Sequence, residues 1–294
     1  MLLFFAQSIS KLIEDMRLTT FITLAMVFTC MNAQQHTTLV WSDEFNTDGA
    51  PDSDKWEFEE GFVRNHEDQW YKKENAYQKD GLLIIECRKE TTPQKNPWYN
   101  PDIKQWNRQR DSIRYTSACL ITKNKFSFRY GRLEVRARIP VSYGAWPAIW
   151  TLGNKMEWPS CGEIDLLEFY RTDGKPYILA NFAWGNERHY DAVWKSAKIP
   201  YEHFLSTDPF WATRFHIWRM DWDENTIRIY LDDELLNEVS QSTTINGSIG
   251  KHKSPFTQPH YILLNLALGG DNGGWIDDTA FPMRYEIDYV RVWK

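Results

Sequence analysis

Short apolar runs separated by turn residues recur through the body of this chain, and they limit its fold more than any other feature. Residues 132–139 alternate four charged with four apolar side chains, the period of a strand with one polar face. That polar face is either solvated or part of a polar cleft. Gly, Asp and Asn gather between the runs, as at 269–274, and indicate loops. Because no long 3.6-residue period competes, we expect an all-β fold, an antiparallel sandwich or barrel.

The N-terminal residues 1–33 have the pattern of a signal peptide. Arg17 precedes a short apolar run at 21–28, and Ala33 supplies a small residue near the expected cleavage site. Met16 is an alternative start. The run is much shorter than the roughly 20 apolar residues of a spanning helix, so export is expected, to the medium, the periplasm or the cell surface.

Cys30 suggests a lipid anchor, but residues 27–29 before it lack the small side chains that such processing sites show. No later segment is long and apolar enough to span a membrane. No linker, repeat or low-complexity stretch divides the remaining chain. We therefore expect one catalytic domain over residues 34–294, acting as a monomer.

Removal of the leader leaves Cys87, Cys119 and Cys161, an odd number without the paired spacing of a zinc site. A disulfide framework is excluded, and Cys161, although close to Glu163, is expected to be a buried, inert thiol. The net charge of −6 disfavours nucleic acid as a partner. A neutral polysaccharide is compatible with this charge.

Three acids, Glu163, Asp165 and Glu168, lie within one expected strand. Side chains alternate along a strand, so Glu163 and Asp165 share a face while Glu168 would point into the core. A buried carboxylate without a partner is costly. We therefore predict a one-residue β-bulge near residues 166–167, which returns Glu168 to the polar face.

The predicted spacing favours a specific chemistry. With one residue absorbed by the bulge, the Cα atoms of Glu163 and Glu168 lie about 13 Å apart, and leaning side chains bring the carboxyl groups to roughly 5–6 Å. At that separation one carboxylate attacks an anomeric carbon while the other protonates the leaving oxygen, with retention of configuration. Asp165 is expected to raise the pKa of Glu168 by its like charge and to orient Glu163 by a hydrogen bond. The spacing does not say which glutamate plays which role.

Acid clusters of this kind also occur on solvated strand edges and in calcium sites. Here the acids alternate with the core residues Ile164 and Leu166, so a solvated edge does not explain them. Aromatic residues make up 15% of the chain, and aromatic faces either fill a core or stack on sugar rings. The tryptophans near the acids in the sequence are Trp146, Trp150, Trp158 and Trp184.

At these residues the chain resembles the laminarinase-like branch of glycoside hydrolase family 16. The motif Glu-x-Asp-x-x-Glu carries the resemblance, which extends over nearly the whole mature chain. It implies a β-sandwich jelly roll of two curved antiparallel sheets with a concave substrate cleft. It also implies that Glu163 is the nucleophile, Asp165 its helper and Glu168 the acid/base. The other matching segments are 41–45, 130–136, 144–150, 158–165 and 287–292.

The resemblance also implies binding residues. Trp146 and Trp150 correspond to the aromatic floor of the subsites on the non-reducing side, and Asn65 to a residue that binds sugar hydroxyls. No cofactor is expected for catalysis, but a structural Ca²⁺ is implied, held by Glu44 and Asp288. The remaining candidates for binding substrate are Trp158, Asn181, Trp184 and Arg114.

One departure concerns specificity. Many laminarinases carry His-Trp-Gly after the catalytic strand, and this chain has Ala183 at the His position. The hydrogen bond of that His is either missing or made instead by Asn181. The insert at 91–110, rich in aromatic residues and Arg, is expected to form a loop over the cleft.

The function expected is that of a secreted, retaining endo-β-glycanase acting on laminarin-type β-1,3-glucan or on mixed-linkage β-1,3/1,4-glucan. One alternative on the same fold is hydrolysis of an algal galactan such as agarose or porphyran. Another is a non-catalytic carbohydrate-binding sandwich, which has no need of Glu163 and Glu168 together. Transglycosylation through the same glycosyl-enzyme also stays open.

Overall fold

The structure, a computed structural model, describes residues 37–294. Residues Thr38–Lys294 form one compact unit. The predicted signal peptide, the alternative start at Met16 and the lipid-anchor candidate Cys30 lie outside the described residues. Among residues 37–294, the structure contains no helix with the length and apolar character that crossing a membrane requires.

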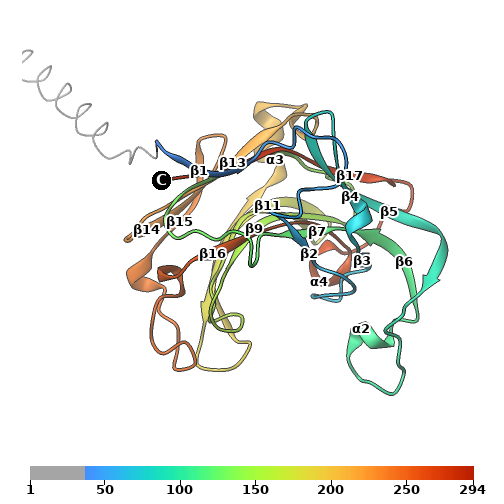
Figure 1. Ribbon diagram of the computed structural model, residues 1–294, viewed down its shortest axis with the longest axis horizontal. Helices are drawn as coiled ribbons and strands as arrows, with labels where there is room; N and C mark the ends of the chain where they lie inside the picture. The colour runs from blue at the N-terminus through green and yellow to red at the C-terminus, as the bar shows by residue number, and fades with distance from the viewer. Residues whose placement is uncertain (1–36) are drawn as a thin grey trace, which may run out of the picture. The chain divides into compact units, whose positions relative to one another are not determined.

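Two sheets stack as layers in the described unit (Figure 1). The ten-stranded outer sheet has the order β15-β14-β13-β8-β17-β5-β6-β3, with β1 added on β17 and β4 on β5. Its strands are antiparallel except for the parallel pair β3 and β6. Its bounds are β1 Leu39–Asp43, β3 Gln69–Tyr71, β4 Ala76–Lys79, β5 Leu82–Lys95, β6 Ser112–Ser117, β8 Gly131–Arg138, β13 His216–Trp222, β14 Thr226–Leu231, β15 Glu234–Ser240 and β17 Met283–Trp293.

The seven-stranded inner sheet has the order β12-β11-β10-β9-β16-β7-β2 and is antiparallel. Its bounds are β2 Glu57–Phe58, β7 Cys119–Ile121, β9 Ala145–Gly153, β10 Glu163–Thr172, β11 Lys175–Gly185, β12 Ala192–Pro200 and β16 His260–Leu268. These two sheets confirm the predicted all-β sandwich.

The helices of the described residues are short. The α-helices are α2 Trp106–Gln109, α3 Tyr201–Thr207 and α4 Gly270–Gly273. The 3-10 helices are η1 Lys73–Asn75, η2 Trp211–Thr213, η3 Gln241–Thr243 and η4 Pro255–Thr257. Helices this short interrupt loops and add no layer to the sandwich.

The core lies between the sheets, and β8 shows why these residues form a strand. Leu133, Val135 and Ala137 alternate into the core with full burial. The charged residues between them face outward in ion pairs, such as Arg132 with Asp221. The polar face that the sequence predicts here is therefore a ladder of ion pairs on the outer sheet and not a cleft.

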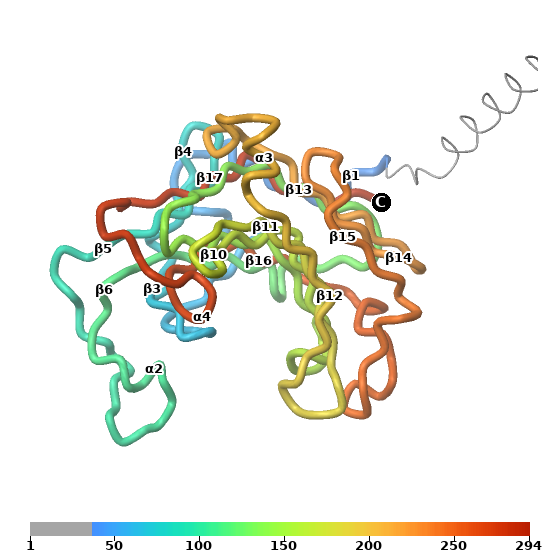
Figure 2. Tube along the Cα trace, turned by 180° about the vertical axis from the view of Figure 1, so that it is seen from behind, coloured from blue at the N-terminus to red at the C-terminus, as the bar shows by residue number. Residues whose placement is uncertain are grey.

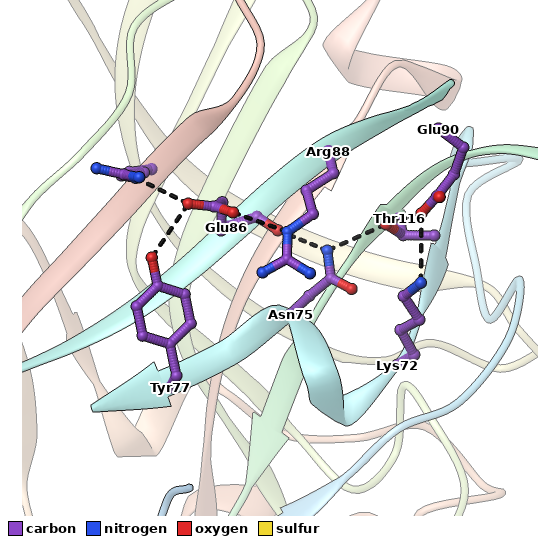
Figure 3. A network of polar contacts seen from close by, with 8 residues as sticks. Lys72, Asn75, Tyr77, Glu86, Arg88, Glu90 and Thr116 are labelled. Carbon is purple, nitrogen blue, oxygen red and sulfur yellow. Dashed lines mark hydrogen bonds and ion pairs between the residues drawn. The ribbon is translucent and has the colours of Figure 1, made fainter. Parts of the chain in front are cut away.

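A polar network on β5 joins four strands of the outer sheet (Figure 3). Glu86 accepts hydrogen bonds from Tyr77 of β4, Arg88 of β5 and Arg284 of β17. Thr116 of β6 extends the network toward η1 and β5.

The free cysteines Cys87, Cys119 and Cys161 are buried, as expected for inert thiols.

The insert at 91–110 does not cover the cleft, so that expectation is wrong. It continues β5 to Lys95 and then carries α2, which extends outward beyond β5 and β6 (Figure 1). Its Trp98 and Trp106 pack against Phe62 and Trp70 in a small separate apolar cluster. Within the described residues, no member of the insert lines the cleft. The insert instead contacts the segment 62–68, which reaches the cleft.

Candidate active site

Strand β10 carries the predicted bulge. Asp165 pairs with Asn181 of β11 and Glu168 pairs with Leu179, so three steps on β10 face two on β11. Pairing with β9 shifts in the same place. The two residues between the acids, Leu166 and Leu167, are both fully buried in the core. The bulge therefore places Glu168 on the same face as Asp165, as the sequence predicts.

That face forms the floor of a cleft with a volume of about 530 Å³. Polar and aromatic side chains from β9, β10, β11, β12 and β16 contribute to it, together with the segment before β3 and the helix α4. The lining residues are Arg64, Asn65, Glu67, Trp146, Ala148, Trp150, Leu152, Trp158, Glu163, Asp165, Glu168, Tyr170, Asn181, Trp194, Ser196, Asn265 and Asn272. The structure thus brings the three acids together with Asn65, Asn181 and three of the predicted tryptophans.

Indole and amide groups hold the two glutamates in place. Trp158 Nε1 donates to Glu163, beside the start of β10. Glu168 accepts from Trp146 Nε1 at 2.9 Å and from Asn181 Nδ2 at 2.7 Å, one donor on each carboxylate oxygen. Because each glutamate has its own donors from neighbouring segments, the two carboxyl groups are fixed independently.

Burial raises the pKa of all three acids. The pKa of Glu168 rises to about 7, first through burial and then through the charge of Glu163, against the hydrogen bond from Trp146. The pKa of Asp165 is raised well above its usual range by burial and by both glutamates. Sequence reasoning attributed the shift of Glu168 to like charge, whereas burial is the larger cause.

The pKa of Glu163 is raised by burial, and the hydrogen bond from Trp158 and then the one from Asp165 act against this rise. Glu163 can therefore be ionised while Glu168 is protonated. A double displacement at an anomeric carbon requires one ionised carboxylate and one protonated carboxylic acid. The cleft floor carries both.

A buried chain of hydrogen bonds connects two binding candidates, and we call it the Glu67 chain. Asn65 Nδ2 donates to Glu67 at 3.3 Å, and Tyr71 Oη donates to Glu67 at 3.1 Å. Asn265 donates to Tyr71 at 3.0 Å and accepts from Trp150 Nε1 at 2.7 Å. The Glu67 chain fixes the amide of Asn65 and the indole of Trp150 relative to each other, through the carboxyl group of Glu67.

Two residues predicted to bind substrate, Trp184 and Arg114, lie outside the cleft lining. Trp184 packs in the core between the sheets, because it lies an odd number of residues from Asn181 and strand alternation turns it away from the cleft. Arg114 is exposed on β6 of the outer sheet, apart from the cleft lining. Parity along β11 was a sufficient signal to exclude Trp184.

Several lining residues escaped sequence reasoning. Tyr170 follows Glu168 by two residues on regular strand, so alternation could have placed it in the cleft. Arg64, Asn265, Asn272 and Trp194 gave no such signal. They come from segments far apart in the sequence, and only strand pairing brings them to one surface.

The residues proposed for calcium do not fit that role in the structure. Glu44 accepts hydrogen bonds from Arg291 at 2.9 and 2.7 Å, and Asp288 pairs with Arg136. A guanidinium group thus occupies each carboxylate and would repel a cation. Among residues 37–294 there is no group of three or more His, Cys, Asp or Glu side chains placed to hold a metal ion.

Comparison with known proteins agrees with this geometry. The chain is 33% identical over 309 residues to the β-glucanase of Rhodothermus marinus, covering 97% of this chain and 96% of that protein. The structure of a laminarinase from Rhodothermus marinus matches with a TM-score of 0.71 and 33% identity, covering 87% of this chain and 97% of that one.

A structure reported with the endo-acting O-glycanases by which human gut bacteria initiate mucin breakdown matches with a TM-score of 0.75 and 32% identity, covering 87% and 90%. The family model described as glycosyl hydrolases family 16 matches residues 63–291, which include the bulged strand and every lining residue of the cleft. The chain therefore belongs to glycosyl hydrolase family 16.

Proposed function

We propose that the protein is a retaining endo-β-glucanase that hydrolyses laminarin-type β-1,3-glucan or mixed-linkage β-1,3/1,4-glucan. The observation that carries the proposal is the bulged strand β10, which presents Glu163 and Glu168 on the cleft floor with the pKa of Glu168 raised to about 7. The similarity to the Rhodothermus marinus β-glucanase supports the choice of glucan.

The reaction proceeds in two displacements. Glu168 donates its proton to the glycosidic oxygen while Glu163 attacks the anomeric carbon, so the glycosidic bond breaks, the chain on the reducing side leaves as an alcohol, and a glycosyl-enzyme forms. Glu168, now ionised, accepts a proton from water, and the water oxygen attacks the anomeric carbon and releases Glu163. The hydrogen bond from Asp165 orients Glu163 for the attack. The two glutamates supply the acid, the base and the nucleophile, so these steps need no cofactor.

The cleft offers a neutral sugar two kinds of contact. The indole faces of Trp146, Trp150 and Trp158 match the apolar faces of pyranose rings, and the amide of Asn65 matches their hydroxyl groups. Trp150 packs with Tyr261 and Leu263, which hold its ring in place.

The decisive experiment is release of reducing sugar from laminarin, barley β-glucan, agarose and porphyran. We expect release from laminarin or barley β-glucan, and activity on a galactan alone would refute the glucanase proposal.

Glu163→Gln should abolish turnover and leave glucan binding intact. If the wild type already binds glucan without cleaving it, and Glu163→Gln changes neither property, the protein is a non-catalytic binding sandwich. Analysis of product lengths separates hydrolysis from transglycosylation, because transfer yields products longer than the substrate.

A second candidate is a glycan that contains β-linked galactose. Ala183 pairs with Glu163 across the sheet, at the position where many laminarinases carry a His, so the space beside the nucleophile differs. A keratan-sulfate endo-1,4-β-galactosidase of Sphingobacterium multivorum, 29% identical over 262 residues, supports this candidate. Adding keratan sulfate and mucin O-glycans to the same panel tests it, and cleavage of these without cleavage of glucans would favour it.

We also propose that the protein is exported by its N-terminal segment and acts as a monomer. N-terminal sequencing of the protein recovered from the medium, the periplasm and the membrane fraction locates it and tests the lipid anchor at Cys30.

Calcium was implied by the family resemblance alone. Melting of the purified protein with Ca²⁺ and with a chelator tests it, and because arginines occupy Glu44 and Asp288 we expect equal melting temperatures.

A further inference from the structure

Trp194 is an exposed tryptophan that faces the cleft from the edge strand of the inner sheet. It lies on β12, and 46% of its surface is exposed, although it lines the cleft. Figure 2 shows β12 on one side of β10 and β11, with α4 on the other. An indole face left in water on a sheet edge is not explained by packing of the core.

The strand register places Trp194 in one row with the nucleophile. Glu163 pairs with Ala183, and Ala183 pairs with Trp194, so the three residues share the cleft face. In this row the residue between Glu163 and Trp194 is Ala183, whose side chain is a single methyl group. Ala183 itself is fully buried, so a larger side chain at 183 would have to displace the groups that cover it.

A second tryptophan lies next to the same row. The ring of Trp158 lies 6.5 Å from the ring of Trp194, at an interplanar angle of 50°. Trp158 also donates its indole N–H to Glu163, so its ring position is tied to the nucleophile. The two indoles and the small side chain of Ala183 form an aromatic corner next to Glu163.

We propose that this corner, made of Trp158, Ala183 and Trp194, is a sugar subsite at the β12 edge of the cleft. It holds a neutral hexopyranose of the bound glycan by stacking the apolar face of the ring on Trp194. The adjacent charge of Glu163 disfavours an anionic sugar in this place. Occupation of the subsite extends the contact between glycan and cleft to the sheet edge. The assignment rests on the proposed function only in that the ligand is a glycan.

The test measures binding in the Glu163→Gln background, where the glycan is not consumed. The probes are laminarihexaose, laminaritriose, a mixed-linkage glucan hexasaccharide and a galactose-containing keratan hexasaccharide without sulfate, each titrated by calorimetry. Trp194→Ala should weaken binding of the preferred hexasaccharide about tenfold, because one stacked ring is lost. Trp194→Phe should restore most of the affinity.

The matched control is Trp275→Ala. Trp275 is 69% exposed and follows α4, outside the cleft lining, so its loss should leave the dissociation constant unchanged. Ala183→Val should weaken the same probe as Trp194→Ala, because Ala183 is fully buried and the added methyl groups would displace the neighbouring indoles. In the active enzyme, Trp194→Ala should raise KM for the hexasaccharide while kcat changes less than about twofold.

Equal affinity of Trp194→Ala and its parent for every probe would overturn the subsite, and so would binding of no probe by the parent. An equally large loss of affinity in Trp275→Ala would also overturn the subsite, because it would show that removal of any exposed indole weakens binding. These outcomes are separate from those of the proposed function. If the enzyme binds and cleaves only the galactose-containing probe, and Trp194→Ala weakens binding of that probe, the subsite proposal stands and the glucanase proposal is refuted.

Discussion

Glu168 keeps its proton near neutral pH because burial raises its pKa to about 7 from its ordinary value of 4.5. As general acid it must be protonated when the substrate binds, so activity is lost as the pH rises through this pKa. We predict that kcat/KM falls above about pH 7, approaching about tenfold per unit. A pH profile of the wild-type enzyme measures this. A level profile up to pH 9 would contradict the assignment.

The identity of the three acids could be predicted from the sequence, because parity along one strand is a local property. The choice among tryptophans could not be made in the same way. Trp184 and Trp194 are both near the acids in space, but the first faces the core and the second the cleft. Trp184 could have been excluded by parity with Asn181, whereas Trp194 required the pairing of β12 with β11.

At the scale of the element, the bulge in β10 is a single extra residue with a structural cost and a function. Leu166 and Leu167 both face the core, so deletion of Leu166 restores plain alternation and still leaves Glu168 on the cleft face. We predict a folded enzyme with a free energy of unfolding about 2–5 kcal/mol lower, as for removal of a buried Leu.

Its kcat/KM should remain at least tenfold above that of Glu168→Gln, because the acid is still present. Denaturant unfolding and initial rates on the preferred glucan measure both quantities. If the deletion variant folds and is as inactive as Glu168→Gln, the bulge has a role in catalysis beyond setting the face of Glu168.

The insert at 91–110 supports the cleft from outside. Arg110 donates to Asp68 at 2.7 Å and to the carbonyl oxygen of His66, next to the cleft residues Arg64 and Asn65. We predict that Arg110→Ala raises KM for glucan about threefold to tenfold and changes kcat less than twofold, because a binding segment becomes less fixed.

Arg108→Ala is the matched control, since Arg108 is in the same insert but contacts Trp98 and not the segment 62–68. A fall in kcat at constant KM in Arg110→Ala would argue against a positioning role. The sequence predicted that this insert forms a loop over the cleft, because its aromatic content could not tell contact with substrate from packing. Trp98 and Trp106 are used in the small cluster with Phe62 and Trp70.

At the scale of the whole molecule, the outer and inner sheets respond to pH in opposite directions. Hydrogen bonds from Arg291 lower the pKa of Glu44, and those from Arg88 and Arg284 outweigh burial to lower the pKa of Glu86. Their stabilisation is present above the ordinary pKa of 4.5 and is lost as the pH falls through the lowered value. Burial raises the pKa of Glu168 to about 7, so its protonated form stabilises the fold below 4.5, and this stability is lost as the pH rises through about 7.

Glu168→Gln removes the second effect. We predict that its melting temperature exceeds that of the wild type by a margin that grows between pH 4.5 and pH 7.5, to about 3–8 °C. Thermal melts at four pH values measure the margin. Glu202→Gln, on the exposed surface of α3, is the control and should show no growth. A margin that is constant with pH would mean that the Glu168 carboxylate is not destabilised by burial.

The fold class could be predicted from alternation and turn residues alone, because short strands with polar turns admit few other solutions. Strand order and the location of the cleft could not, because they depend on contacts between residues far apart in sequence. The sequence left open which polar strand faces lie in the cleft, and β8 turned out to face solvent with its ion pairs.

The central claim is that Glu163 and Glu168 cleave a β-glucan by double displacement. Proton NMR of the reducing ends released from laminarihexaose, recorded in the first minutes before mutarotation, tests it most directly. With retention, we expect that the β-anomer forms first and that the α-anomer follows only at the rate of mutarotation. Release of the α-anomer first would show inversion and would contradict Glu163 as a nucleophile.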